Sequence, residues 1–107
     1  MRIVRHPLVA QDIRALAEHV LTVSGDRAAA LRRLDEIDAL IAEIVANPDL
    51  GARLDGALTG WRVRHGGQGR AITLVFRPEG ERLLVALVAF GRQDWTTTSA
   101  ARRGFGA

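Results

Sequence analysis

Cysteine, lysine and tyrosine are all missing from this 107-residue chain. Without cysteine there is no disulfide, no thiolate ligand for zinc and no thiol nucleophile. Without lysine, all 15 basic side chains are arginines, which stay protonated near neutral pH and are poor general bases. The three histidines are the side chains that titrate near neutral pH.

Long hydrophobic runs are also missing. No apolar segment approaches the roughly 20 residues of a membrane-spanning helix, and the N-terminus lacks the pattern of a signal peptide. We therefore expect a cytoplasmic protein with no membrane partner. A hydrophobic content of 48% suits a single domain over residues 1–107.

The charges are distributed unevenly along the chain. Residues 1–59 carry 7 arginines and 9 carboxylates, whereas residues 60–107 carry 8 arginines and 3 carboxylates. The C-terminal half is therefore electropositive, which predicts an acidic partner, either nucleic acid or acidic protein.

The longest apolar run, from Leu83 to Phe90, predicts a strand that is buried on both faces. Strict alternation assigns its side chains to two faces: Leu83, Val85, Leu87 and Ala89 on one, and Leu84, Ala86, Val88, Phe90 and Arg92 on the other. Both faces then need a cover. One can come from helices, and the other from a thin cover by the chain termini or from a partner protein.

Two helices are predicted before this strand. The first runs from about residue 8 to Ser24 and ends at Gly25, and Asp26 is placed to cap the second. The second continues with the same apolar spacing to Asn47-Pro48, where proline disfavours further helix. The short turn between them makes the helices antiparallel neighbours.

Alternating segments predict the remaining strands, at residues 1–5, 61–65 and 70–77. In the second of these, Trp61, Val63 and His65 share one face, and Arg62 and Arg64 share the other. Residues 49–60 are expected to form a loop, and residues 96–107 a loose tail or short helix. The predicted fold is therefore α+β, an antiparallel sheet of β-α-α-β-β-β order with a helical hairpin packed on one face.

Motifs for cofactors and metals are weak. The segment Gly66-Gly67-Gln68-Gly69 joins two strands and lacks the residues of a phosphate-binding loop, so it predicts a hairpin turn. The histidines show no metal-ligand spacing, so we expect neither a metal nor a cofactor. His65 is the only candidate general base in the basic half.

The arginines are the more informative set. Five lie on or at the ends of the predicted strands: Arg62, Arg64, Arg70, Arg77 and Arg92. Guanidinium groups suit phosphate or carboxylate recognition, although a solvated sheet face explains a small basic excess equally well. Arg70 and Arg92 fall on the same face of their predicted strands as large apolar residues. Each is therefore expected at a strand end or partly buried with a partner. Trp95 fits either a binding surface or the edge of the core.

Taken together, these features resemble the RelE/ParE superfamily of bacterial toxins from type II toxin-antitoxin systems. The resemblance spans Met1 to about Arg103 and includes the strand-helix-helix-three-strand order. The residues that carry it are Gly25 with Ala28-Ala29, Asn47-Pro48 with Gly51, Arg62, Arg70 at the start of a strand, and Gly91-Arg92 at the end of another.

The resemblance implies a cytoplasmic toxin that arrests growth, as in plasmid stabilization systems, and that contacts operator DNA only through its antitoxin. The cognate antitoxin would wrap the toxin with its C-terminal segment and supply the second cover of the sheet. RelE-like members cleave mRNA on the ribosome, whereas ParE-like members inhibit DNA gyrase without a recognised hydrolytic site.

The missing lysines and tyrosine favour the ParE-like function, which is not enzymatic. Its expected target- or antitoxin-binding residues are Arg62, Arg70, Arg77, Arg92 and Trp95. The alternative is a ribosome-dependent mRNA endoribonuclease with Arg64, His65, Arg70 and Arg92 at the catalytic site. A lesser alternative is a protein-interaction domain without toxicity.

Overall fold

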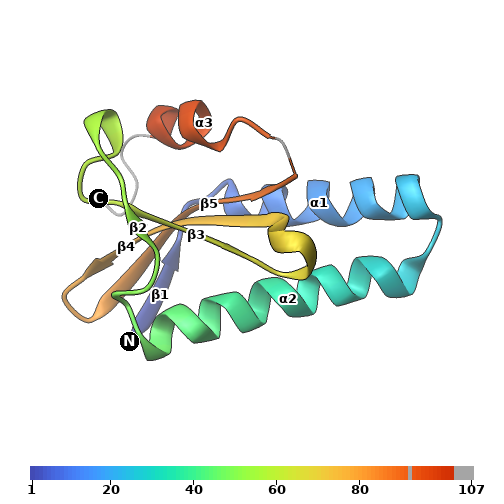
Figure 1. The fold of residues 1–107 in the computed structure, drawn as a ribbon, viewed down its shortest axis with the longest axis horizontal. Helices are drawn as coiled ribbons and strands as arrows, with labels where there is room; N and C mark the ends of the chain where they lie inside the picture. Colours follow the sequence, from blue (N-terminus) through green and yellow to red (C-terminus); the bar gives the residue numbers. More distant parts are fainter. Residues whose placement is uncertain (92, 103–107) are drawn as a thin grey trace.

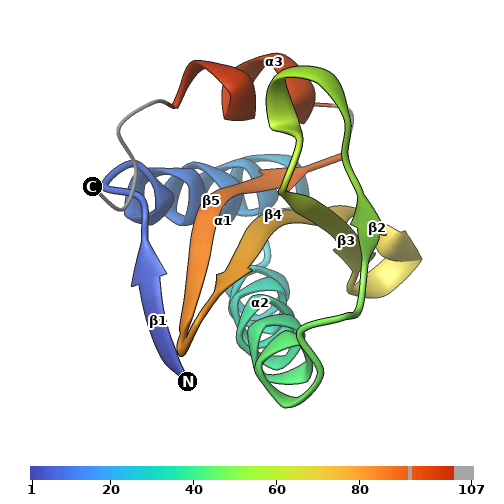
Figure 2. The ribbon, with the colours of Figure 1, turned by 90° about the vertical axis from the view of Figure 1, so that its left-hand side faces the viewer.

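A five-stranded sheet divides the molecule, with a long helical hairpin on one face and a short helix on the other (Figures 1 and 2). The computed structural model describes residues 1–91 and 93–102. Its strands are β1 (Arg2–Arg5), β2 (Ala52–Arg53), β3 (Arg62–Gly66), β4 (Ile72–Glu79) and β5 (Arg82–Phe90). Its helices are α1 (Val9–Ser24), α2 (Arg27–Ala46) and α3 (Trp95–Ala101), with 3₁₀ turns η1 (Gly56–Leu58) and η2 (Gln68–Arg70).

The strand order is β1-β5-β4-β3-β2. Strands β2 to β5 pair antiparallel, whereas β1 pairs parallel with β5, from Arg2 opposite Arg82 to Arg5 opposite Val85. The predicted α+β fold and the helical hairpin on one face are confirmed. The sequence did not indicate the parallel pairing of β1 or the two-residue strand β2, which lies within the predicted loop 49–60.

The hairpin begins and ends where the local chemistry predicts. Gly25 follows α1 in the left-handed region, with φ of 64°, a conformation that costs glycine little. The Asp26 carboxylate accepts a 2.9 Å hydrogen bond from the Ala28 N–H and caps α2. Helix α2 ends at Ala46, immediately before Asn47-Pro48. These caps fix the turn that brings α1 and α2 side by side.

The apolar residues form two cores, one on each side of the sheet. The hairpin-side core contains Val9, Leu16, Ile37, Leu40, Ile41, Ile44, Ile72, Leu74, Phe76, Leu83, Val85 and Val88. The C-terminal-side core contains Val63, Val75, Ala86, Leu87 and Ala89, with Leu54, Trp61 and Trp95 packed against it. Long helices enclose the first core, and short segments enclose the second.

A β-bulge changes which face the residues of β5 occupy. Val75 of β4 lies opposite Leu87, but the next residue, Phe76, lies opposite Val85, so Ala86 is an extra residue in β5. Val88 therefore joins Val85 in the hairpin-side core, and Leu87 moves to the other core. The strict alternation predicted for this strand is correct as far as Ala86 and wrong from Leu87 onward, because the bulge shifts the side-chain parity by one.

The chain itself covers the second face of the sheet. Helix α3 packs against β5 and η1, and Leu84, Ala86 and Leu87 are each only 3% exposed. Of the two covers considered from the sequence, the thin one from the C-terminal segment is present, so no partner is needed to bury β5. The predicted tail begins with α3, and residues 103–107 lie outside the described residues. None of the described helices is long and apolar enough to cross a membrane.

Candidate functional site

The two arginines of β3 share one face of the strand, as their parity predicts, and the structure shows that this face is the one toward the helical hairpin. The Arg64 guanidinium forms an ion pair with the Glu43 carboxylate of α2. Arg62 Nη1 donates a 3.1 Å hydrogen bond to the Asp49 carbonyl oxygen, and its Nη2 is 3.9 Å from Asp49 Oδ1. Both side chains are therefore held by the protein's own acceptors, in the last turn of α2 and in the loop that follows it.

His65 lies on the opposite face of the sheet. Its Nδ1 is 2.9 Å from Thr73 Oγ1, on the residue directly across in β4. Its ring meets Trp95 of α3 edge-on, with centroids 6.1 Å apart and planes at 68°. His65 therefore links the sheet to its C-terminal cover, and Trp95 packs at the edge of the C-terminal-side core.

Arg70 does not open a strand, contrary to the sequence prediction. It is exposed at the end of η2, with φ of 56°, and β4 begins two residues later at Ile72. Gln68 donates its N–H to the Glu36 carboxylate of α2 at 3.3 Å, which draws the glycine-rich turn onto the hairpin. The turn thus takes Arg70 out of the ladder and holds it in a conformation that is strained for a residue with a Cβ.

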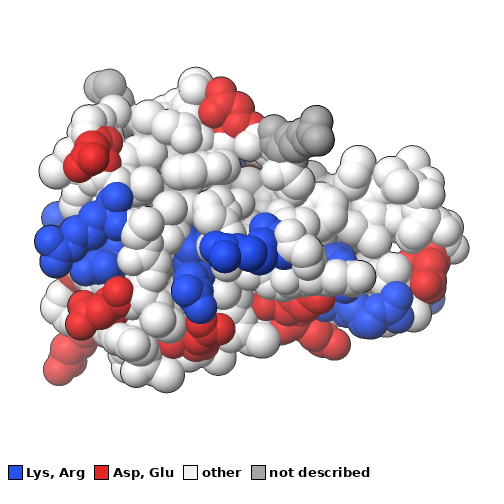
Figure 3. All heavy atoms as spheres, viewed as in Figure 1, with Lys and Arg blue, Asp and Glu red and all other residues white. Residues whose placement is uncertain are grey.

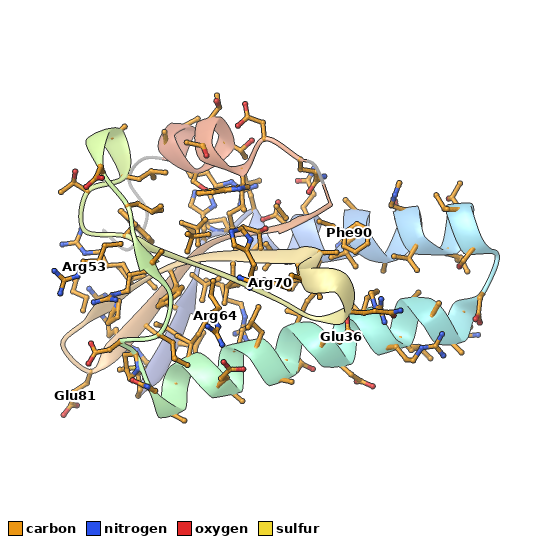
Figure 4. The ribbon with its side chains drawn as sticks, viewed as in Figure 1. Glu36, Arg53, Arg64, Arg70, Glu81 and Phe90 are labelled. Atoms are coloured by element: carbon orange, nitrogen blue, oxygen red, sulfur yellow. The ribbon has the colours of Figure 1, made fainter. Side chains whose placement is uncertain are left out.

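Arg70 makes no ion pair within residues 1–91 and 93–102, and its guanidinium is open to a partner. Figure 4 shows Arg64 and Arg70 near β3, whereas Arg53 lies at the far end of the sheet. Arg92 lies outside the described residues.

A second group of arginines lies at the end of the sheet formed by β2, β3 and β4. Arg53 and Arg62 are directly opposite each other in β2 and β3, and the Arg77 guanidinium lies against Gly60. Arg77 Nε is also 3.7 Å from Glu79 Oε2. A cavity of about 330 Å³ lies between Arg53, Trp61 and Arg62. Figure 3 shows the arginines gathered at this end with acidic side chains beside them, so the patch is mixed in charge.

A buried ion pair that the sequence did not reveal joins α1 to the C-terminal segment. Arg102 makes two 2.6 Å hydrogen bonds to the Asp12 carboxylate, across a sequence separation of 90 residues. The side chains are 8% and 13% exposed. Asp12 falls between Val9 and Leu16, on the apolar stripe of its helix, and a carboxylate at such a position is the one signal that predicts a buried partner.

His6 lies beside this ion pair and is 8% exposed. Its Nδ1 accepts a 3.1 Å hydrogen bond from the Leu8 N–H at the start of α1. Burial lowers the pKa of His6, the positive charge of Arg102 lowers it further, and Asp12 opposes the shift. The lowered pKa of His6 favours the neutral ring, which is the form whose Nδ1 accepts the Leu8 N–H.

Three of the four predicted catalytic residues, Arg64, His65 and Arg70, lie within the described residues, and they occupy different parts of the fold. Arg64 and His65 lie on opposite faces of β3, and Arg70 lies in a turn beyond it. Among the described residues, no three His, Cys, Asp or Glu side chains are arranged to hold a metal ion. Within residues 1–91 and 93–102, Arg64 and Arg70 therefore belong to surfaces separate from the face that holds His65.

The sequence matches a known protein family over most of its length. Residues 3–95 match the model of the ParE toxin of the type II toxin-antitoxin system parDE. The chain belongs to the ParE toxin family. This ParE-family chain has no match among curated proteins.

Solved structures support the fold of this ParE-family chain. A protein described as the chromosomal ParDE toxin-antitoxin system from P. aeruginosa is 18% identical and superposes with a TM-score of 0.66. That match covers 85% of this chain and 96% of the other. A YoeB/ParE toxin from Agrobacterium tumefaciens is 22% identical, with a TM-score of 0.58, over 84% of this chain and 98% of the other. At these identities the likeness establishes the shared fold.

Proposed function

We propose that this ParE-family toxin acts by binding and inhibiting DNA gyrase, and that it does not cleave RNA. The observation that supports this function is the separation of Arg64 from His65 by the sheet. Cleavage at a ribose 2′-hydroxyl needs a proton acceptor and a cation at the same phosphate. Inhibition by binding needs only an accessible surface.

The contacts of the individual residues favour the same conclusion. The Glu43 carboxylate neutralises Arg64, and Thr73 and Trp95 hold the His65 ring inside the sheet-α3 junction. The exposed Arg70, by contrast, is available to an acidic partner. We therefore assign Arg70 to target binding, together with the surface arginines Arg53 and Arg77, and we assign His65 to packing.

Neutralisation by a cognate antitoxin in the cytoplasm is part of this proposal. It follows from membership of a toxin-antitoxin family and from the excess of positive charge in residues 60–107. Co-production of the neighbouring small protein should restore growth and yield a complex that co-purifies with this chain. Contact with operator DNA would then be made by the antitoxin.

The test compares His65→Gln with Arg70→Ala, and uses the exposed His19→Gln as the matched control. Glutamine can still hydrogen-bond to Thr73 but cannot act as a base, so we expect His65→Gln and His19→Gln to stay toxic. Arg70→Ala should weaken growth arrest and the inhibition of gyrase supercoiling in vitro. Codon-phased mRNA cuts in primer extension that disappear with His65→Gln, alongside normal supercoiling, would establish the nuclease instead.

A further inference from the structure

Strand β5 extends well beyond its neighbour β1, and side chains take the place of the missing strand. β1 ends at Arg5, opposite Val85. Beyond that point the Ala86 carbonyl accepts a 2.7 Å hydrogen bond from Arg102, and the Val88 N–H donates one of 3.1 Å to Asp12. The Phe90 N–H donates a 2.9 Å hydrogen bond to Gln93 Oε1.

These three side chains come from both ends of the chain. Asp12 belongs to the first turn of α1, whereas Gln93 precedes α3 and Arg102 follows it. The Asp12–Arg102 pair therefore joins α1, the bulged part of β5 and the end of α3 in one buried contact. We call Asp12 with Arg102 the clasp, and residues Trp95–Arg102 the strap.

The strap itself is a weak structural element. It has seven helical residues, of which three are threonine and one is serine, all poor helix formers compared with alanine. Ser99 Oγ and Arg102 Nε are both buried without a hydrogen-bond partner, and such groups disfavour the closed state. Its packing is confined mainly to β5 and η1.

We propose that the strap is a hinged cover, held closed by the clasp, which opens as a unit while the rest of the protein stays folded. Gly91, directly after β5, has φ of 66° and no atom within 4 Å of the position of an added Cβ, so we place the hinge at this glycine. Opening uncovers the C-terminal-side core and releases the edge of β5 at Ala86 and Val88.

Because the protein has two separate cores, the strap can open without exposing the core on the hairpin side. Removing the strap uncovers a face made of Val63, Val75, Ala86, Leu87 and Ala89, but it leaves the hairpin-side core enclosed by α1 and α2. Regions with few buried apolar contacts open at lower free energy than the global unfolding of the domain. This property belongs to the fold and is independent of whether gyrase is the target.

Native-state hydrogen exchange on the full chain tests the proposal. In the unmodified protein, the amides of Val88, Ser99 and Ala100 should exchange through an opening with a weaker denaturant dependence than the amides of Ile37 and Ile41 in α2. Asp12→Asn should speed exchange at Val88 and in the strap by at least about tenfold, and exchange in α2 by no more than the same factor, because both openings start from the closed state that the clasp stabilises. Glu79→Gln, which removes the exposed pair with Arg82, is the matched control and should change neither region.

Equal denaturant dependence for the strap and α2 in the unmodified protein would overturn the proposal, because both regions would then open only by global unfolding. This measurement needs no variant, so it decides the matter even if Asp12→Asn folds poorly. Unchanged exchange at Val88 and in the strap in a folded Asp12→Asn protein would likewise contradict the proposal, because the clasp would then not hold the strap closed.

Discussion

The two faces of the sheet are buried in different ways. On the hairpin side, two helices of 16 and 20 residues supply a continuous apolar stripe over the strands. On the other side, a seven-residue helix and the turn η1 cover a smaller set of side chains, and a buried ion pair fixes the end of that cover. Burial of apolar area dominates the first face, whereas specific polar contacts are needed to hold the second.

This difference shows how a small domain can bury a central strand on both faces without two full helical layers. The apolar contribution to stability grows with the area removed from water. A short cover provides less of it and must be positioned by hydrogen bonds that have a defined geometry. The C-terminal side should therefore be the more sensitive to polar substitutions, and the hairpin side to loss of volume.

The largest expected effect on the free energy of unfolding comes from truncating a buried side chain on the hairpin side. Leu74→Ala removes a fully buried side chain on β4 and should lower the free energy of unfolding by about 4 kcal/mol. Leu87→Ala on the C-terminal side should cost about 2 kcal/mol, because a thin cover can settle into the space. Urea denaturation measures both values, and a larger loss for Leu87→Ala would reverse the ranking of the two faces.

The next effect is the loss of charge at the clasp. Asp12→Ala leaves Arg102 buried without its partner and the Val88 N–H without its acceptor. We expect a loss of about 3 kcal/mol in the free energy of unfolding, as for other buried pairs that lose one member. The double variant with Arg102→Leu should recover part of this loss. If the single variant is as stable as the unmodified protein, the ion pair does not hold the cover.

The third prediction concerns pH. His6 is buried near Arg102 with a lowered pKa, so the unfolded chain takes up a proton on this residue at a higher pH than the folded chain. Stability should thus fall as the pH drops from about 6.5 through the folded pKa of His6, and this group contributes no pH dependence above that range.

The control for this pH effect is His6→Asn, since asparagine can still accept the Leu8 N–H at the start of α1. Thermal melts of both proteins are recorded between about pH 8 and about pH 5. Their melting temperatures should change in parallel with pH above about 6.5 and diverge below it. Parallel curves over the whole range would show that His6 does not contribute to acid sensitivity.

Local chemistry was enough to predict the hairpin, because caps and apolar spacing act within a few residues. Gly25, Asp26 and Pro48 set its limits, and the alternation in β3 correctly placed Arg64 and His65 on opposite faces. The limits of the helices and the parity of β3 therefore depend on short-range signals.

The features that sequence reasoning missed depend on contacts between distant segments. The extra residue Ala86 in β5 is visible only in its register with β4, and the clasp joins residues separated by 90 positions. The alternation of Arg70 with the apolar residues that follow it predicts a strand position. In the structure, Glu36 of α2 binds the preceding turn and keeps Arg70 outside the hydrogen-bond ladder of β4. The candidate site was therefore less predictable than the fold.

The smallest expected effect is at the Arg64–Glu43 pair, which sharpens the contrast between exposed and buried ion pairs. The two side chains are 34% and 47% exposed, so water screens their attraction and solvates either one alone. Glu43→Gln should change the free energy of unfolding by less than about 0.5 kcal/mol. The same carboxylate-to-amide change at Asp12 should cost several times more, because its carboxylate is enclosed by α1, β5 and Arg102. Urea denaturation of Glu43→Gln and Asp12→Asn side by side makes the comparison, and equal losses would mean that burial does not distinguish the two pairs.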